Sequence, residues 1–578
     1  MTQYPLADMP GWAAGWFQEI VDRAHTPPTW EWLLGTRVAL AVPLIGWLIW
    51  ARRQRSAWLP LAPLIAISTI SLLRVAATSG ADTDEVEHLH VAWLITHDVL
   101  PYRDVHQNHA PLHWLIATPL LNVLPDSACV LYAFRGLALV AFGGCVGLAC
   151  ALLRALAGGD AARLYPACVC LALIHAVEAQ MYRFRPDIFM VACALGSLLC
   201  LVRAPRRPGI YPLLAGALLG LAISFSPKIG LQLGVAGLAV IMYLVRRQSA
   251  DAVRLGAGYG GGLVLGLLPT VGWLWHHGIV LDAWHSVFAV NAEMLGGRRP
   301  AASWATSGDA RISTVVVPRV LNLAPYAALV VAGAVGMLKR SAGSSPAMQH
   351  HPASRLLTLA SLVLFFAFAA LAPNYLPYHI AGGLILGAAI GAGVVDRLVA
   401  WGRRGLRPVW VGLALAVAMG DTWIRSGVVG RVEGSTARVA DIQALLDVTR
   451  RRGRTCLCLA PMHPIFALDA GHIYTGFDRY SWRWGDTVDR VLSRPPGVVM
   501  DFSWAGLVQR QRITSDQRIE LANLLEQRYR PITIGGQRFW LRDQPAAEDR
   551  FNRRPSRDQR ESPAAPAGQA ARRPRDRR

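Results

Sequence analysis

Long apolar runs recur through most of the chain. A helix needs roughly 17–25 mainly apolar residues to cross the hydrocarbon core of a bilayer. About twelve runs approach that length, at residues 33–50, 57–75, 131–153, 164–177, 188–202, 210–225, 228–245, 255–275, 318–338, 356–372, 379–395 and 408–424. Because 53% of the residues are hydrophobic and only 16% are charged, the sequence predicts a polytopic α-helical membrane protein with about twelve transmembrane helices.

Basic residues follow a regular pattern between these runs. The formal net charge is +21, which in a water-soluble protein would suggest nucleic-acid binding. Here the arginines lie mostly in alternate connections and at the C-terminus, as expected when Lys and Arg concentrate on the cytoplasmic side of a membrane. We therefore expect a multi-pass protein of the inner (plasma) membrane, with both termini outside and with no nucleic-acid partner.

Composition divides the chain into four segments. Residues 1–32 form a mixed lead-in, and residues 33–425 hold the apolar runs, with a first outer loop at 76–130. Residues 426–543 alternate between helix-like and strand-like patterns, which predict a small extracytoplasmic α/β domain. Residues 544–578 are rich in Arg, Pro and Ala, so they cannot bury enough apolar surface to fold and predict a disordered basic tail.

Several elements of the α/β segment are predicted individually. We expect two helices and four strands, with the helices at 438–452 and 515–527 and the strands at 455–460, 497–502, 532–534 and 539–541. The strand TCLCLA carries Cys456 and Cys458, whose spacing differs from that of a C-x-x-C motif. We read these cysteines, and those in the apolar runs, as small buried hydrophobes.

The first outer loop holds a dense group of charges in ADTDEVEHLHVAWLITHDVLPYRDVHQNHAPLHW (81–114), and the group starts with four carboxylates, Asp82, Asp84, Glu85 and Glu87. Apolar residues recur at helical spacing over 85–97 (Val86, Leu89, Trp93 and Leu94), so we expect an amphipathic helix that lies on the bilayer. The following APLHWLIATPLLNVL is too short to span and predicts an interfacial or re-entrant helix.

Asp84 and Glu85 are the catalytic candidates. A carboxylate at the membrane surface can deprotonate or orient an acceptor hydroxyl. The alternative is that Asp82 or Asp84 only caps the helix. Four carboxylates exceed what one cap requires, which favours a functional role.

Three further groups of residues are candidates for substrate binding. Arg183, Arg185 and Asp187 lie at the outer end of an apolar run, where guanidinium groups bind phosphate well and charge tends to be functional; Asp187 beside Pro186 is alternatively a helix cap. Lys228 breaks the charge pattern, so we expect it to bind phosphate or to extend its amine to the membrane surface. Tyr375, Tyr378 and His379 lie between two apolar runs and are either interfacial anchors or pocket residues.

The histidines of the outer loop raise the question of a metal. His109 and His113 are four residues apart, yet no histidine pair is joined to a carboxylate in a familiar zinc pattern. We assign no metal ligands and no required cofactor, and leave a divalent cation open.

Several motifs together resemble one family. Asp84-Glu85, Pro101-Tyr102-Arg103-Asp104, His109-Ala110-Pro111-Leu112-His113-Trp114 and Arg135 are similar to motifs of polyprenyl-phosphate-dependent membrane glycosyltransferases of the C-type (GT-C) superfamily. The similarity is to the group of protein O-mannosyltransferases and aminoarabinose transferases. The family's H-P-P-L reads H-A-P-L here. Arg185-Pro186-Asp187 and L-A-P-M-H-P-I-F (459–466) resemble stretches of one bacterial branch.

This resemblance implies a GT-C-like fold and an activity. The expected reaction is inverting transfer of a sugar from a polyprenyl-phosphate donor to a hydroxyl of a lipid, glycan or protein acceptor, on the outer face of the membrane. Asp84 would be the base or orienting carboxylate. Arg and Lys groups would stabilise the departing lipid phosphate, with Arg103, Asp104 and His109 among the substrate-binding residues. The C-terminal domain would cover the site or select the acceptor.

Two other classes of function remain open at this stage. A secondary transporter suits twelve spans, although its charges should lie near the bilayer midplane. A non-catalytic protein of envelope assembly would retain the same loop without chemistry.

Overall fold

The computed structural model describes residues 58–157, 159–177, 179–204, 209–227, 249–289, 328–335, 358–363, 381–402, 436–458, 462–469, 484–501 and 514–543, together with residues 47, 207, 237 and 326. Lys228, Tyr375, Tyr378 and His379 lie outside these residues. So do the expected apolar spans at 33–50, 228–245 and 408–424, apart from single positions, as well as the lead-in and the basic tail.

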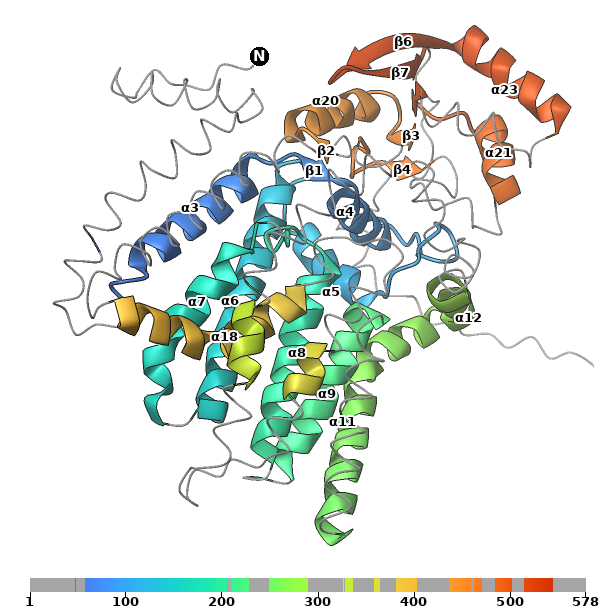
Figure 1. The fold of residues 1–578 in the computed structure, drawn as a ribbon. Helices are drawn as coiled ribbons and strands as arrows, with labels where there is room; N and C mark the ends of the chain where they lie inside the picture. Colours follow the sequence, from blue (N-terminus) through green and yellow to red (C-terminus); the bar gives the residue numbers. More distant parts are fainter. Residues whose placement is uncertain are drawn as a thin grey trace, which may run out of the picture.

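Long apolar helices form one part of the molecule (Figure 1). Among the described residues, four helices are long and apolar enough to cross a membrane. They are α6 (Val130–Ala157), α8 (Pro186–Arg203), α11 (Ser249–His276) and α18 (Ala381–Gly402). Shorter apolar helices accompany them: α3 (Ala62–Thr78), α5 (Leu112–Leu121), α7 (Tyr165–Ile174, preceded by the 3-10 turn Gly159–Leu164) and α9 (Ile210–Phe225).

Glycines bring α9 and α11 into close contact. A Cβ atom on Gly262 would lie 2.0 Å from the Leu213 carbonyl oxygen, and one on Gly216 would lie 2.0 Å from the Tyr259 carbonyl oxygen. Small residues allow helix backbones to approach closely, which is how helices pack in a membrane where the surrounding lipid is as apolar as their side chains. The Gly-rich sequence of α11 therefore sets the distance between these two helices.

Helix α4 (Thr83–Ile95) lies between the apolar helices and the C-terminal part of the chain (Figure 1). The prediction that its apolar stripe faces a bilayer was wrong, because every residue from Glu85 to Leu94 is buried. Val86 and Leu89 share one core with Ile442 and Leu446 of helix α20 (Val439–Arg450). The C-terminal elements cover the face that the sequence pattern alone assigned to lipid.

The C-terminal elements form a mixed five-stranded sheet in the order β4-β3-β5-β7-β6. Its strands are β3 (Thr455–Leu457), β4 (Leu468–Asp469), β5 (Val498–Met500), β6 (Tyr529–Ile534) and β7 (Gln537–Arg542). Strand β3 runs parallel to β4 and β5, whereas β7 is antiparallel to β5 and β6.

The two faces of the sheet pack against different helices. Side chains alternate along a strand, so Cys456 and Val498 join the core shared with α4 and α20, whereas Leu457 and Val499 contribute to a second core. This second core includes residues of α21 (Trp484–Ser493) and α23 (Ser515–Arg528). The sheet is therefore the middle layer between α4 with α20 on one side and α21 with α23 on the other.

Two further contacts join the C-terminal elements to the first outer loop. Strand β2 (Thr436–Ala437) pairs antiparallel with β1 (Ala81–Asp82), directly before α4. Gln443 of α20 accepts hydrogen bonds through Oε1 from the Ser127 hydroxyl at 3.0 Å and from the Ala128 N–H at 2.9 Å. Consequently, the C-terminal elements are fixed to the outer loop at two points, one just before α4 and one just after α5.

Candidate functional site

The acidic cluster begins with a capping box at the N-terminus of α4. Asp82 is the N-cap residue, and its side chain accepts a hydrogen bond from the Glu85 N–H at 2.9 Å. The Glu85 carboxylate accepts in turn from the Asp82 N–H at 3.3 Å. A capping box satisfies two backbone donors that a helix start leaves unpaired. Of the two residues proposed as caps, Asp82 has this role, and Asp84 lies in the first turn.

Arg135 of α6 holds Glu85 in a buried ion pair. Its Nε and Nη2 donate to the two carboxylate oxygens at 2.8 and 2.7 Å, and both side chains are at most 1% exposed. The remaining guanidinium protons go to the carbonyl oxygens of Ala76, Ser79 and Gly80 at 2.8 to 2.9 Å. Arg135 thus joins the C-terminal end of α3 to the N-terminal end of α4.

The segment before α8 brings two more guanidinium groups to the cluster. Arg183 and Arg185 both donate to Asp82 Oδ2, and Arg185 Nη1 lies 3.5 Å from Asp84 Oδ2. Arg183 also donates from Nε to the Tyr182 hydroxyl at 3.2 Å. The two arginines are buried, at 1% and 8% side-chain exposure. Pro186 occupies the first turn of α8, where its fixed φ suits a helix start.

Asp84 differs from its acidic neighbours in exposure. Its side chain is 27% exposed, whereas Asp82, Glu85 and Glu87 are buried. The carboxylates of Asp82 and Glu85 are engaged by arginines and by backbone N–H groups within the cluster. Asp84 is therefore the member of this group that a ligand can reach.

A group of imidazole rings adjoins the arginine segment. The His88 ring lies 4.8 Å from that of His109 and 4.9 Å from that of His113, measured between centroids. The His113 ring stacks on that of Phe184, with the ring centroids 4.1 Å apart. Phe184 lies between Arg183 and Arg185 in the sequence. Burial, followed by the neighbouring His88 and His109, lowers the pKa of His113 well below its usual value, so this ring is neutral at physiological pH.

The tautomer of His88 follows from its neighbour. Trp114 donates its indole N–H to His88 Nδ1 at 3.1 Å, so the proton of a neutral His88 lies on Nε2.

The loop between α4 and α5 carries Arg103 and Asp104. Arg103 donates from Nε and Nη2 to the Asp104 carboxylate at 3.0 and 2.9 Å. The Leu100 N–H also donates to Asp104 at 2.9 Å, which closes the turn. Tyr102, at φ 70°, donates its hydroxyl proton to the His109 carbonyl oxygen at 2.7 Å. This turn holds His109 against the imidazole group.

The structure brings together only part of the residues that the sequence singled out. Asp84, Glu85, Arg183 and Arg185 lie in one connected network, and His109 joins it through His88 and His113. Arg103 and Asp104 pair with each other, and Asp187 is half-buried in the first turn of α8. Sequence reasoning did not foresee that Asp82 would be the partner of both buried arginines. The sequence shows Asp82 at a position suited to capping a helix, but nothing in it indicates that Arg183 and Arg185 are its partners.

Comparison with solved structures addresses the fold. The chain is similar to ArnT from Cupriavidus metallidurans in the apo state, with a TM-score of 0.52 and 13% identity over 84% of this chain and 98% of that one. The chain therefore has a GT-C-like fold. The sequence resemblance to this superfamily is therefore confirmed at the level of the fold.

Two other similarities are weaker. The same ArnT bound to undecaprenyl phosphate gives a TM-score of 0.47 at 13% identity, over 84% of this chain and 98% of that one. The oligosaccharyltransferase of Archaeoglobus fulgidus gives 0.42 at 13% identity. That match covers 67% of this chain and 58% of the archaeal one. Comparison with protein-family models and with curated protein sequences finds no match.

Proposed function

We propose that this protein transfers a sugar from a polyprenyl-phosphate donor to an acceptor hydroxyl, with inversion at the sugar carbon, and that Asp84 is its base or orienting carboxylate. The accessibility of Asp84 carries the proposal. It is the partly exposed carboxylate of a cluster whose other members are buried. Of these, Asp82 and Glu85 are held by arginines and by backbone N–H groups. The C-type glycosyltransferase fold, supported by the similarity to ArnT, makes glycosyl transfer the reaction class to test.

Glu85 has a different role in this proposal, although it follows Asp84 directly in the sequence. It accepts hydrogen bonds from Arg135, from the Asp82 N–H and, at 3.4 Å, from the Phe184 N–H. This buried carboxylate is already occupied by protein donors, so an acceptor hydroxyl has no place to bind to it. Glu85 is therefore a positioning residue that orients the first turn of α4 and, through it, Asp84.

Arg185 lies on the Asp84 side of the arginine pair. Its Nη1 is 3.5 Å from Asp84 Oδ2, so the guanidinium lies beside the proposed base. A departing lipid phosphate gains negative charge as the sugar leaves, so a guanidinium in this position stabilises the transition state. Lys228, Asp187, Arg103, Asp104, His109, Tyr375, Tyr378 and His379 are proposed to contact the donor or the acceptor.

The proposed setting is the outer face of the inner membrane. The α/β segment covers α4 and therefore lies on the same side of the membrane as the cluster. In this position it can close the site over a lipid-linked donor or select the acceptor, which is a lipid, a glycan or a protein. No metal is assigned to the reaction itself.

The experiment is sugar transfer in proteoliposomes that contain a radiolabelled polyprenyl-phosphate sugar and candidate acceptors. Asp84→Asn should abolish transfer while leaving the protein folded and able to bind the donor. Asp98→Asn is the matched control, because Asp98 is an exposed acid in the same loop, and it should retain activity. The anomeric configuration of the product tests inversion.

Three outcomes would contradict the proposal. Equal turnover of wild type and Asp84→Asn would move the base elsewhere, with Asp187→Asn tested next. A product with the donor's own anomeric configuration would exclude an inverting transfer. Movement of intact donor across the bilayer without cleavage would indicate transport.

A further inference from the structure

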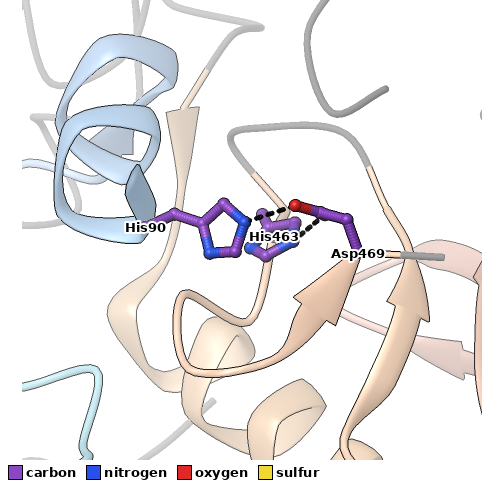
Figure 2. A group of neighbouring side chains, drawn as sticks. All are labelled: His90, His463 and Asp469. Carbon is purple, nitrogen blue, oxygen red and sulfur yellow. Dashed lines mark hydrogen bonds and ion pairs between the residues drawn. The ribbon is translucent and has the colours of Figure 1, made fainter. Parts of the chain in front are cut away.

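A second cluster of titratable side chains lies where α4 meets the C-terminal sheet. His90 comes from α4, His463 from the segment between β3 and β4, and Asp469 from β4 (Figure 2). One nitrogen or oxygen atom of each residue lies within 4.8 Å of the others. The two histidine side chains are fully buried and that of Asp469 is 6% exposed. Among the described residues, this is the group whose spacing suits a metal ion.

The contacts of His90 bring a ring nitrogen and a carboxylate oxygen face to face. Its Nδ1 lies 2.7 Å from the Ile465 carbonyl oxygen, so this nitrogen carries a proton and donates it. Its Nε2 lies 2.7 Å from Asp469 Oδ2. In a neutral ring this Nε2 has only a lone pair, and a lone pair repels a carboxylate oxygen at that distance. Either a proton shared by the two atoms or a metal ion must lie between them.

His463 faces the same carboxylate. Its Nε2 lies 3.1 Å from Asp469 Oδ1 and 3.3 Å from Cys456 Sγ. The Ile465 N–H donates to Nδ1 at 3.1 Å, which places the proton of the ion-free ring on Nε2. A metal ion at Nε2 moves that proton to Nδ1 and breaks the bond from Ile465. The proton on His90 Nε2 leaves to solvent.

We propose that His90 Nε2, His463 Nε2 and the Asp469 carboxylate bind a Zn²⁺ ion that fastens the C-terminal sheet onto α4. Imidazole nitrogens and a carboxylate are ordinary zinc ligands. The buried Cys456 Sγ lies 3.3 Å from His463 Nε2 but outside the group of atoms that meet within 4.8 Å. It becomes the fourth donor after a shift of its side chain, and its proton leaves when zinc binds. The Ile465 carbonyl that receives the His90 Nδ1–H is the kind of outer hydrogen bond that orients a metal-binding histidine.

The position of the site indicates a structural ion. A catalytic zinc keeps one coordination position open to water or substrate, whereas a structural zinc has its ligands closed around it. Here the two imidazoles are fully buried, and the ring centroids lie 3.9 Å apart. The ligands also join parts of the chain that are 379 residues apart. An ion that binds only this folded arrangement stabilises it by mass action.

The test is the zinc content of the full chain, purified in detergent with an affinity tag that contains no histidine and dialysed against a weak chelator. We expect about one zinc per chain in the wild type. His90→Gln and His463→Gln should lose most of it. His97→Gln, which removes another histidine near the same helix, should keep it. A strong chelator should increase protease cleavage within the C-terminal sheet and within the outer loop, because zinc no longer holds these two parts together.

Cobalt gives a second readout, which begins with the wild type alone. Co²⁺ added to the chelator-treated wild type should produce the visible absorption of a tetrahedral site, with a thiolate band that Cys456→Ser removes and Cys458→Ser retains. Two results would overturn the proposal, and the first of them does not depend on the folding of any variant. In the first, the wild-type protein stays nearly free of zinc when zinc is supplied and gives no cobalt spectrum. Protons alone would then bridge the cluster. The other is equal zinc in His90→Gln, His463→Gln and His97→Gln. Neither readout depends on sugar transfer.

Discussion

Arg135 and Glu85 form a two-point ion pair, with Nε on Oε1 at 2.8 Å and Nη2 on Oε2 at 2.7 Å. The pair lies beneath the first turn of α4, so the conformation of that turn depends on α6. Removing one member of a buried pair leaves the other charge uncompensated. The same guanidinium also serves three carbonyl groups at the end of α3, so the loss extends beyond one interaction.

Arg135→Met should therefore destabilise the protein by about 3–5 kcal/mol. The measurement is thermal or denaturant unfolding in detergent. Arg163→Met is the matched control, because Arg163 pairs with Asp396 at 3.1 Å while it is 62% exposed. An exposed pair of this kind contributes about 0–1 kcal/mol. Equal losses in the two variants would show that Arg135 is not a structural centre.

Asp82→Asn tests whether the carboxylate charge or only its capping ability matters. Asparagine caps helices about as well as aspartate, so the capping box should survive. Arg183 and Arg185 would nevertheless lose the shared counter-charge in a buried setting, and we expect a loss of about 3–5 kcal/mol. The free energy of unfolding and the rate of sugar transfer are measured for the same variant. The transfer rate should also fall, because the arginine segment shifts relative to Asp84.

A second capping box in the chain provides the control. Thr514 caps α23 at the surface, where Gln517 closes the box. Thr514→Ala should cost only about 0.5–2 kcal/mol. If Asp82→Asn were as mild as this variant, the two arginines would not depend on Asp82.

Gly262→Ala tests the contact between α9 and α11. The added methyl group would lie 2.0 Å from the Leu213 carbonyl oxygen, so the helices must separate. Overpacking of this kind costs about 1–3 kcal/mol, measured as a lower unfolding midpoint in detergent. Gly261→Ala is the neighbouring control, since its Cβ would meet no atom within 4 Å. A midpoint that is unchanged for both would contradict the close approach.

Asp104 gives a pH dependence to the loop between α4 and α5. Burial raises its pKa, but hydrogen bonds from Arg103 and the Leu100 N–H outweigh burial, and the net pKa is lowered. A lowered folded-state pKa means that the stabilisation is full above the unfolded value of about 3.9. It is lost as the pH falls from there through the folded pKa.

Protease cleavage of this loop should therefore increase as the pH falls below about 4. Asp104→Asn should show raised cleavage that no longer changes over this range. The measurement uses an acid-stable protease. If it cleaves the wild-type loop at the same rate above and below this pH, Asp104 does not have this role.

Local patterns allowed several elements to be predicted. Pro186 marked the start of α8, and the apolar runs at 57–75, 131–153, 164–177, 188–202, 210–225, 255–275 and 379–395 coincide with α3, α6, α7, α8, α9, α11 and α18. The expected strands at 455–460 and 497–502 contain β3 and β5, and the expected helix at 515–527 lies within α23. These features depend on propensity and periodicity over a few residues, which a single sequence displays.

Contacts between distant segments explain what the sequence did not reveal. The stripe of α4 looked suited to lipid because Val86 and Leu89 are apolar at helical spacing, and hydrophobicity alone does not distinguish lipid from protein. Ile442 and Leu446, which pack in the same core, follow more than 350 residues later. Likewise, neither the pairing of Asp82 with Arg183 nor that of His90 with Asp469 leaves a mark in local spacing.

The short pairing of β1 with β2 has a consequence for biosynthesis. Ala81 lies opposite Ala437, so the backbone just before α4 can acquire its partner only after more than 350 further residues have been synthesised. Domains generally fold in order during synthesis, at about 5–20 residues per second. The acidic cluster must therefore wait roughly tens of seconds for its C-terminal cover, and a chain that terminates before residue 436 would leave α4 without it.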